Sequence, residues 1–249
     1  MEGANTVRSL AADLFSRAGE GFVQTDPELV SFFGDFAYGE ARTESALDGK
    51  TRYLVILPSL IACQATALYK AMLVEALDAG MAPVEVKEVS YHAIAYVGMA
   101  KAFDCIAATN EVLAERGVDL PLRGQSTTGP ETRFEKGLAV QKEIFGSAID
   151  AAYESAPSDQ LHIQRFLSAN CFGDYYTRGG LNAAQRELVT FALILALGGC
   201  EPQLTAHVNA NLSVGNDRAT LVGAVTELIP YIGYPRSLNA LRCITEATS

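Results

Sequence analysis

The stretch that decides the fold is RELVTFALILALGGC, which runs from Arg186 to Cys200. It contains the longest apolar run of the chain, Leu188 to Gly199, and its dozen or so residues fall well short of the roughly 20 needed to span a bilayer. We therefore expect a buried core helix here. The helix should end at Gly198 and Gly199, because glycine is favoured where the chain must leave a helix in a conformation costly to other residues.

Helical spacing continues on both sides of this segment. Ala and Leu are plentiful, and β-branched residues in an alternating pattern are rare. Between residues 117 and 130 the sequence GVDLPLRGQSTTGP has the Gly, Pro and Ser/Thr content of a linker. The sequence thus predicts an all-α fold, with helices at about 4–18, 28–38, 50–64, 67–79, 83–98, 100–116, 131–146, 150–155, 160–172, 184–198, 202–213, 217–229 and 233–247.

The two sides of this linker repeat one another. Four short motifs occur in both halves, in the same order and at offsets between 134 and 139 residues, which indicates an internal duplication. We expect a first repeat over 1–116, a linker over 117–130 and a second repeat over 131–249, packed together as a pseudo-dimer. The matching motifs are Phe33-Gly34-Asp35 with Phe172-Gly173-Asp174, Arg52-x-Leu54 with Arg186-x-Leu188, Leu77-x-x-Gly80 with Leu212-x-x-Gly215, and Tyr96-Val97-Gly98 with Tyr231-Ile232-Gly233.

The composition restricts partners and compartment. A net charge of −10, a pI near 4.8 and the absence of a basic stripe give a surface that repels phosphate backbones and anionic lipid. Neither nucleic acid nor a membrane is expected as a partner. The five cysteines form no CxxC pair and no zinc-finger spacing, and the chain starts without a signal peptide. We expect a cytoplasmic protein with reduced thiols, no metal and no cofactor.

Reactive side chains follow the buried helix. Pro202 predicts the first position of a new helix and places Cys200 just before it, where free N–H groups and the helix dipole favour a thiolate. His207 lies two turns further on, close to the same face, with a ring suited to proton transfer near neutral pH. The alternative for the cysteine is an inert, small apolar residue of the core.

Glu187 is the third candidate. The ordinary interpretation is a first-turn acid that complements the helix dipole and pairs with Arg186 or Arg178. A straight helix would carry it up to roughly 18 Å from Cys200. We expect Glu187 to join the site only if helix packing or a neighbouring chain brings it back.

Three segments resemble the carboxymuconolactone decarboxylase family, which also includes the alkyl hydroperoxidase D-like proteins. They are residues 186–200, His207-Val208-Asn209-Ala210-Asn211, and residues 229–241. The similarity covers about 30–110 and 165–245. It implies an all-helical fold, oligomers of six repeats with active sites near subunit interfaces, and therefore a homotrimer of this two-repeat chain.

In the peroxidase-like branch of that family, a Glu, a CxxC pair and a His form a proton-relay and redox site. Glu187 matches the Glu, Cys200 the first Cys and His207 the His, but Gln203 stands at the second Cys. An oxidised Cys200 would therefore need another thiol, either Cys171 or an external dithiol. Our leading hypothesis is a peroxiredoxin-like antioxidant oxidoreductase in which Cys200 attacks a hydroperoxide.

Two other functions remain open. One is a cofactor-free decarboxylase or isomerase of a small lactone or β-keto acid, with His207 as the acid and Arg236 or Arg178 binding the substrate carboxylate. The other is a non-catalytic trimeric binding scaffold. In the first repeat, the positions opposite Glu187, Cys200 and His207 are held by Tyr53, Ala65 and Met72. We expect that repeat to be scaffold, with packed core residues at Cys63, Tyr69 and His92.

Overall fold

The computed structural model describes residues 2–19 and 21–248, and within them every regular element is a helix. The all-α prediction is confirmed. Two elements, named η1 and η2, are π-helices. In chain order the elements are α1 (Glu2–Ala18), α2 (Phe22–Thr25), α3 (Pro27–Phe33), η1 (Gly34–Ala41), α4 (Arg42–Ser45), α5 (Gly49–Ala62), α6 (Thr66–Asp78), α7 (Pro83–Val97), α8 (Met99–Glu115), α9 (Arg133–Phe145), α10 (Ala148–Ser155), α11 (Leu161–Phe166), η2 (Leu167–Tyr176), α12 (Ala183–Leu197), α13 (Glu201–Ser213), α14 (Arg218–Ile232) and α15 (Tyr234–Ala247).

The same order of helices occurs twice. A π-helix followed by four long α-helices appears as η1 with α5 to α8 and again as η2 with α12 to α15, with the short α4 after η1 in the first copy alone. The predicted helices at 28–38 and 160–172 end too early, because the chain continues helically through η1 to Ser45 and through η2 to Tyr176. A π-helix adds residues to each turn, so the apolar spacing of an α-helix is lost there.

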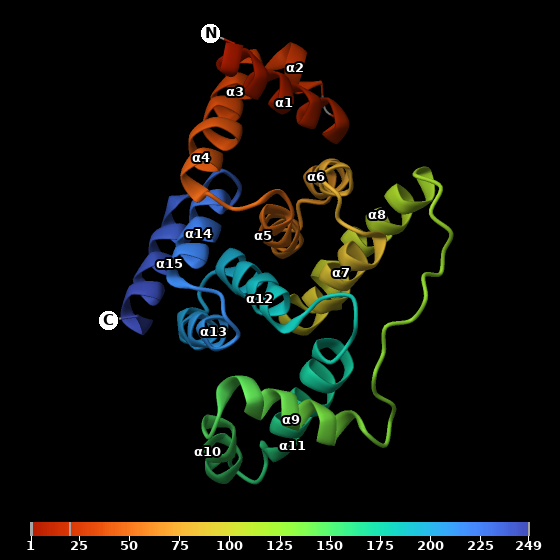
Figure 1. Ribbon diagram of the computed structural model, residues 1–249, viewed down its shortest axis with the longest axis vertical. Helices are drawn as coiled ribbons and strands as arrows, with labels where there is room; N and C mark the ends of the chain where they lie inside the picture. The colour runs from red at the N-terminus through yellow and green to blue at the C-terminus, as the bar shows by residue number, and fades with distance from the viewer. Residues whose placement is uncertain (1, 20, 249) are drawn as a thin grey trace.

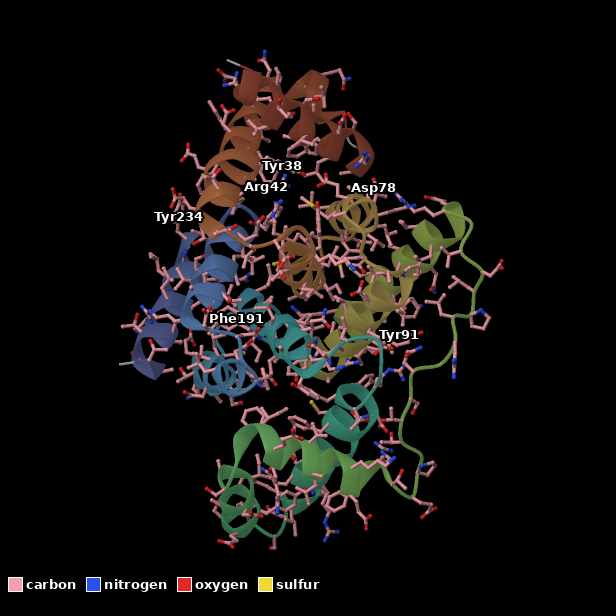
Figure 2. All side chains as sticks on the ribbon, viewed as in Figure 1. Tyr38, Arg42, Asp78, Tyr91, Phe191 and Tyr234 are labelled. Carbon is pink, nitrogen blue, oxygen red and sulfur yellow. The ribbon has the colours of Figure 1, made fainter. Side chains whose placement is uncertain are left out.

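Helices α5 and α12 lie against each other at the centre of the molecule (Figure 1). Both are buried around most of their circumference, from Arg52 to Ala62 and from Arg186 to Ala196. Phe191 of α12 lies near the middle of the fold (Figure 2). Each of these two helices also packs against a helix of the other repeat. Helix α7 of the first repeat packs on α12 of the second, and α14 of the second packs on α5 of the first. The two repeats therefore share one hydrophobic core.

A buried ion pair also joins the repeats. Arg52 of α5 donates to Glu227 of α14 at 2.7 Å, and their side chains are 3% and 1% exposed. Glu227 also accepts a hydrogen bond from Ser45 at the end of α4. Removing one partner within this arrangement would leave the other charge buried and uncompensated.

Helices α9 to α11 and η2 form a separate layer beside this core (Figure 1). Helix α9 packs on η2 so closely that a Cβ atom on Gly137 would overlap the carbonyl oxygen of Ser168, and one on Gly173 would overlap that of Arg133. A small apolar cluster that includes Ile144 joins the layer to the core. In the first repeat, α1 packs on η1 as α9 does on η2.

The segment between Glu115 and Arg133 contains no helix and runs along one side of the molecule from α8 to α9 (Figure 1). Across the described residues, no helix combines the length and the hydropathy required to cross a membrane.

Candidate active site

Glu187 and His207 form a direct pair. His207 Nδ1 lies 2.7 Å from Glu187 Oε2, and the carboxylate is 0% exposed while the imidazole is 13% exposed. Tyr176 donates to the other carboxylate oxygen at 3.0 Å. A carboxylate only accepts, so Nδ1 carries the proton. His207 Nε2 makes no hydrogen bond within the described part of the chain and is free for proton transfer.

The turn between α12 and α13 brings the pair together. Gly198 and Gly199 both have φ of +70°, a left-handed conformation that favours glycine, and they reverse the chain direction. Asn211 then ties the two helices together, donating to the backbone oxygens of Glu187 at 3.0 Å and of His207 at 2.7 Å. Glu187 therefore pairs with His207 of the next helix. The ordinary interpretation, in which it forms an ion pair with Arg186 or Arg178, is wrong.

Aromatic rings from two directions enclose His207. Tyr96 of α7 lies edge to face with the imidazole, with centroids 5.8 Å apart, and Phe145 of α9 does so at 5.4 Å. Tyr96 belongs to the first repeat, so that repeat contributes a ring to the surroundings of His207. The Tyr96-Val97-Gly98 motif was the sequence signal, although nothing in its spacing indicates that α7 packs on α12.

A polar chain lies behind these rings. Arg186 Nη1 is 3.4 Å from His92 Nδ1, and His92 Nε2 is 2.9 Å from the Thr190 hydroxyl. Arginine only donates, so His92 Nδ1 accepts and Nε2 carries the proton. Burial, and then the positive charge of Arg186, hold the pKa of His92 well below its usual value. His92 is thus neutral and makes a fixed hydrogen bond beneath the site.

A cavity of about 370 Å³ lies on the other side of Tyr176, and neither Glu187 nor His207 is among its lining residues. Tyr176 lines it and donates to Glu187, which connects the cavity to the carboxylate. Its volume falls within the range of small-molecule sites. The remaining walls come from α9, the start of α12 and the end of α13, through Val140, Glu143, Ile144, Ala183, Ser213 and Val214.

Two segments of the chain, residues 27–111 and 162–246, match the carboxymuconolactone decarboxylase family. The chain belongs to this family. It is similar to 4-carboxymuconolactone decarboxylase of Acinetobacter baylyi (strain ATCC 33305 / BD413 / ADP1), with 31% identity over 117 residues that make up 47% of this chain and 87% of that protein. The resemblance is confirmed, as is the tandem arrangement of two repeats. Both halves of the site, Tyr96 and the Glu187–His207 pair, lie in the matched segments.

In this family member, Cys200 lies apart from the pair. Helix α13 begins at Glu201, so Cys200 is its N-cap and Pro202 its second residue, not its first. The sulfur donates to the carbonyl of Gly198 at 3.6 Å and accepts no hydrogen bond from the N–H groups of α13. The hollow beside it, lined partly by Ile194, holds only about 10 Å³, which is room for about one water molecule.

Cys171, the candidate resolving thiol, lies on η2 and contacts the Tyr96 hydroxyl at 3.9 Å. Burial raises its pKa to about 12, so the group is a neutral thiol near neutral pH. It makes no contact with Cys200, and the cysteines of the described residues are all free. The structure thus brings Cys171 near the Glu187–His207 pair but not near the proposed nucleophile.

The two candidate carboxylate-binding arginines are engaged elsewhere. Arg178 binds both oxygens of Glu88 at 2.9 to 3.0 Å, and Arg186 binds the same carboxylate at 3.1 Å. Arg236 Nη1 lies 3.5 Å from Cys63 Sγ. Neither Arg178 nor Arg236 lines the cavity next to Tyr176. No three His, Cys, Asp or Glu side chains of the described residues are grouped to hold a metal ion.

Proposed function

We propose that the protein is a cofactor-free decarboxylase of a small lactone or β-keto acid, in which His207 moves the proton. The observation that supports this most directly is the 2.7 Å contact between His207 Nδ1 and the fully buried Glu187. Family membership supports a carboxy-lyase, and the similar protein of Acinetobacter baylyi is named as a decarboxylase of 4-carboxymuconolactone.

The reaction requires one proton transfer. The C–C bond to the substrate carboxylate breaks, CO₂ leaves, and the electron pair moves into the conjugated carbonyl to form an enolate. The imidazolium form of His207, which carries a proton on each ring nitrogen, then delivers its Nε2 proton to the carbon, and the neutral ring takes a new proton from water. Glu187 accepts the hydrogen bond from Nδ1–H throughout and stays ionised, which keeps Nε2 directed at the substrate, as a carboxylate orients the histidine of other acid–base sites.

The cavity next to Tyr176 is where we place the substrate. Val140, Ile144 and Val214 form the apolar part of its wall, and Glu143, Ser213 and Tyr176 form the polar part. Decarboxylation turns a localised carboxylate charge into a dispersed enolate and neutral CO₂. Apolar walls destabilise the localised charge more than the dispersed one, which favours the reaction.

The surroundings of Cys200 support a thiol peroxidase less well. A peroxide needs space at the sulfur and a nearby group to handle its protons. Cys200 is half-buried beside a hollow of about 10 Å³, and His207 pairs with Glu187 instead of with the sulfur. Cys200→Ser is therefore the variant that separates the two enzymatic functions.

The experiment measures CO₂ release from a panel containing 4-carboxymuconolactone, other small lactone carboxylic acids and β-keto acids. We expect His207→Gln to lower kcat by about 10²- to 10⁴-fold on the active substrate. Cys200→Ser should retain activity. His162→Gln, which changes an exposed histidine of α11, is the matched control.

Two results would contradict the proposal. One is an unchanged kcat for His207→Gln on a substrate that the wild type decarboxylates. The other is an absence of CO₂ release across the panel together with hydroperoxide reduction that Cys200→Ser abolishes, which would establish the thiol peroxidase.

We also propose that the chain assembles as a homotrimer, so that six repeats form the ring expected for the family. Large apolar side chains exposed on the single chain support an interface, among them Phe32, Phe103, Phe166 and Leu238. These residues are scattered over several elements, as contacts with two neighbouring subunits require.

A further inference from the structure

A second and larger cavity, of about 530 Å³, lies between α7, the end of α8 and the linker. Figure 2 shows Tyr91 in the region between α7 and the linker. The cavity shares no lining residue with the one next to Tyr176. It is therefore a separate site, and the inference drawn from it does not depend on the proposed function.

Lys87 gives this cavity a buried positive charge. Its residue is only 9% exposed, and its ammonium group lies 2.6 Å from the Asn110 side-chain oxygen and 4.9 Å from the centre of the Tyr91 ring. Both partners are neutral, and no carboxylate of the described residues forms an ion pair with Lys87. Buried charges are normally paired, so the ammonium can still accept an anionic partner.

The other charges at this cavity are also mainly positive. Arg178 lies on the Tyr91 ring at 5.3 Å, and Arg123 of the linker lines the wall. The one carboxylate of the lining, Glu88, is already bound by Arg178 and by Arg186 behind it. In a chain with a net charge of −10, this concentration of cations is a local exception.

We propose that this cavity binds a small organic anion with one carboxylate and an apolar body. The carboxylate would lie against the Lys87 ammonium, with the guanidinium of Arg123 on the same cavity wall, where charge-assisted hydrogen bonds are strong. The apolar body would pack against Val84 and Leu122. The volume suits a small molecule and is too small for a macromolecular partner.

Benzoate is the probe, and benzamide is its neutral counterpart of the same shape. Titration followed by calorimetry or by NMR shifts should show benzoate binding to the wild type, with benzamide at least about tenfold weaker, a difference of about 1.4 kcal/mol. Lys87→Met keeps the length of the side chain, removes its charge and should weaken benzoate binding to a similar extent. Lys142→Met removes a lysine that pairs with Asp150 on the far layer and should change nothing.

Asn110→Asp provides a second route, because it places a carboxylate beside the Lys87 ammonium without removing the lysine. It should also abolish the preference for benzoate, and it decides the question if Lys87→Met does not fold. His207→Gln should bind benzoate as the wild type does. Three results would overturn the proposal. The wild type could bind benzamide as tightly as benzoate, or Asn110→Asp could bind benzoate as tightly as the wild type. The third result is a loss of benzoate binding in His207→Gln, which would place benzoate in the catalytic cavity.

Discussion

The ring of Tyr96 contacts the imidazole of His207 edge to face, with centroids 5.8 Å apart and planes at 79°. The two residues come from different repeats, and Tyr96 is half-buried against His207 while Glu187 pairs with Nδ1 of the same imidazole. A carboxylate of one repeat and an aromatic ring of the other thus both contact the imidazole of His207. The site belongs to the pair of repeats and not to the second repeat alone.

A positioning role for Tyr96 predicts different behaviour for two substitutions. Tyr96→Phe keeps the ring and should retain kcat within about twofold, whereas Tyr96→Leu removes the edge-to-face contact and should lower kcat by about tenfold with little change in KM. Steady-state kinetics of decarboxylation measure both. Equal losses in the two variants would show that the ring does not orient His207.

His92 predicts a loss of stability in mild acid. Its folded-state pKa lies well below 6.5 because of burial and Arg186, while in the unfolded chain it takes up a proton near 6.5. Between these two values the unfolded state binds more protons, so stability falls as the pH drops below 6.5, by at most about 1.4 kcal/mol per pH unit for this group. Urea unfolding at pH 7.5 and pH 5.5 measures the change. His92→Gln should lose that part of the pH dependence, and an unaltered slope in the variant would assign it to other groups.

The contact of α9 with η2 predicts that Gly137 tolerates no side chain. In Gly137→Ala the new methyl group would overlap the backbone at Ser168 and at Gly173, so the helices must separate, at a cost of about 1–3 kcal/mol. Gly39→Ala is the matched control, since a Cβ atom at that π-helical glycine meets nothing within 4 Å. Equal midpoints of urea unfolding for the two variants would argue against the close approach.

The ion pair between Arg52 and Glu227 should contribute far more than a surface pair. Glu227→Ala leaves a buried guanidinium without its partner and should destabilise the fold by about 3–5 kcal/mol. Asp78→Ala breaks the exposed pair with Arg116 and should change stability by less than about 1 kcal/mol. Chemical denaturation compares them, and similar losses would mean that burial adds nothing to the first pair.

The proposed assembly has a direct measurement. Sedimentation equilibrium should give a mass three times the 26.6 kDa of one chain. Leu238→Lys, which places a charge on an exposed apolar position of α15, should shift the mass toward that of one chain if this face is covered in the trimer. A wild-type mass of 26.6 kDa would show that the protein is a monomer and would contradict the proposed trimer.

Much of the fold follows from apolar spacing, but the π-helices do not. The predicted segments from 50 to 116 and from 184 to 247 agree with α5 to α8 and α12 to α15 within a few residues, because these helices end at glycines or begin at capping residues. Within η1 and η2 no start or stop residue marks the change, so the sequence gives no sign that the helix continues.

The pairing of Glu187 with His207 was within reach of the sequence. Helices α12 and α13 are antiparallel about Gly199, so residues at similar distances before and after that glycine lie opposite one another. Glu187 therefore approaches residues near 207 to 211, and Cys200, at the turn, stays far from it. The contact of Tyr96 with His207 was not predictable in this way, because only the three-dimensional packing shows that α7 lies against α12 of the other repeat.

Glu227 and His92 occupy equivalent positions of the two repeats, 135 residues apart. Glu227 contacts Arg52, and His92 contacts Arg186, which is the equivalent of Arg52 in the second repeat. One half has retained a charged carboxylate there, while the other holds a neutral imidazole. In a ring of identical single-repeat subunits, every subunit would have the same residue at this position, either the carboxylate or the imidazole. With two copies joined in one polypeptide, the two contacts between repeats can differ, so that one is a buried ion pair and the other leads from Arg186 through a neutral imidazole to Thr190.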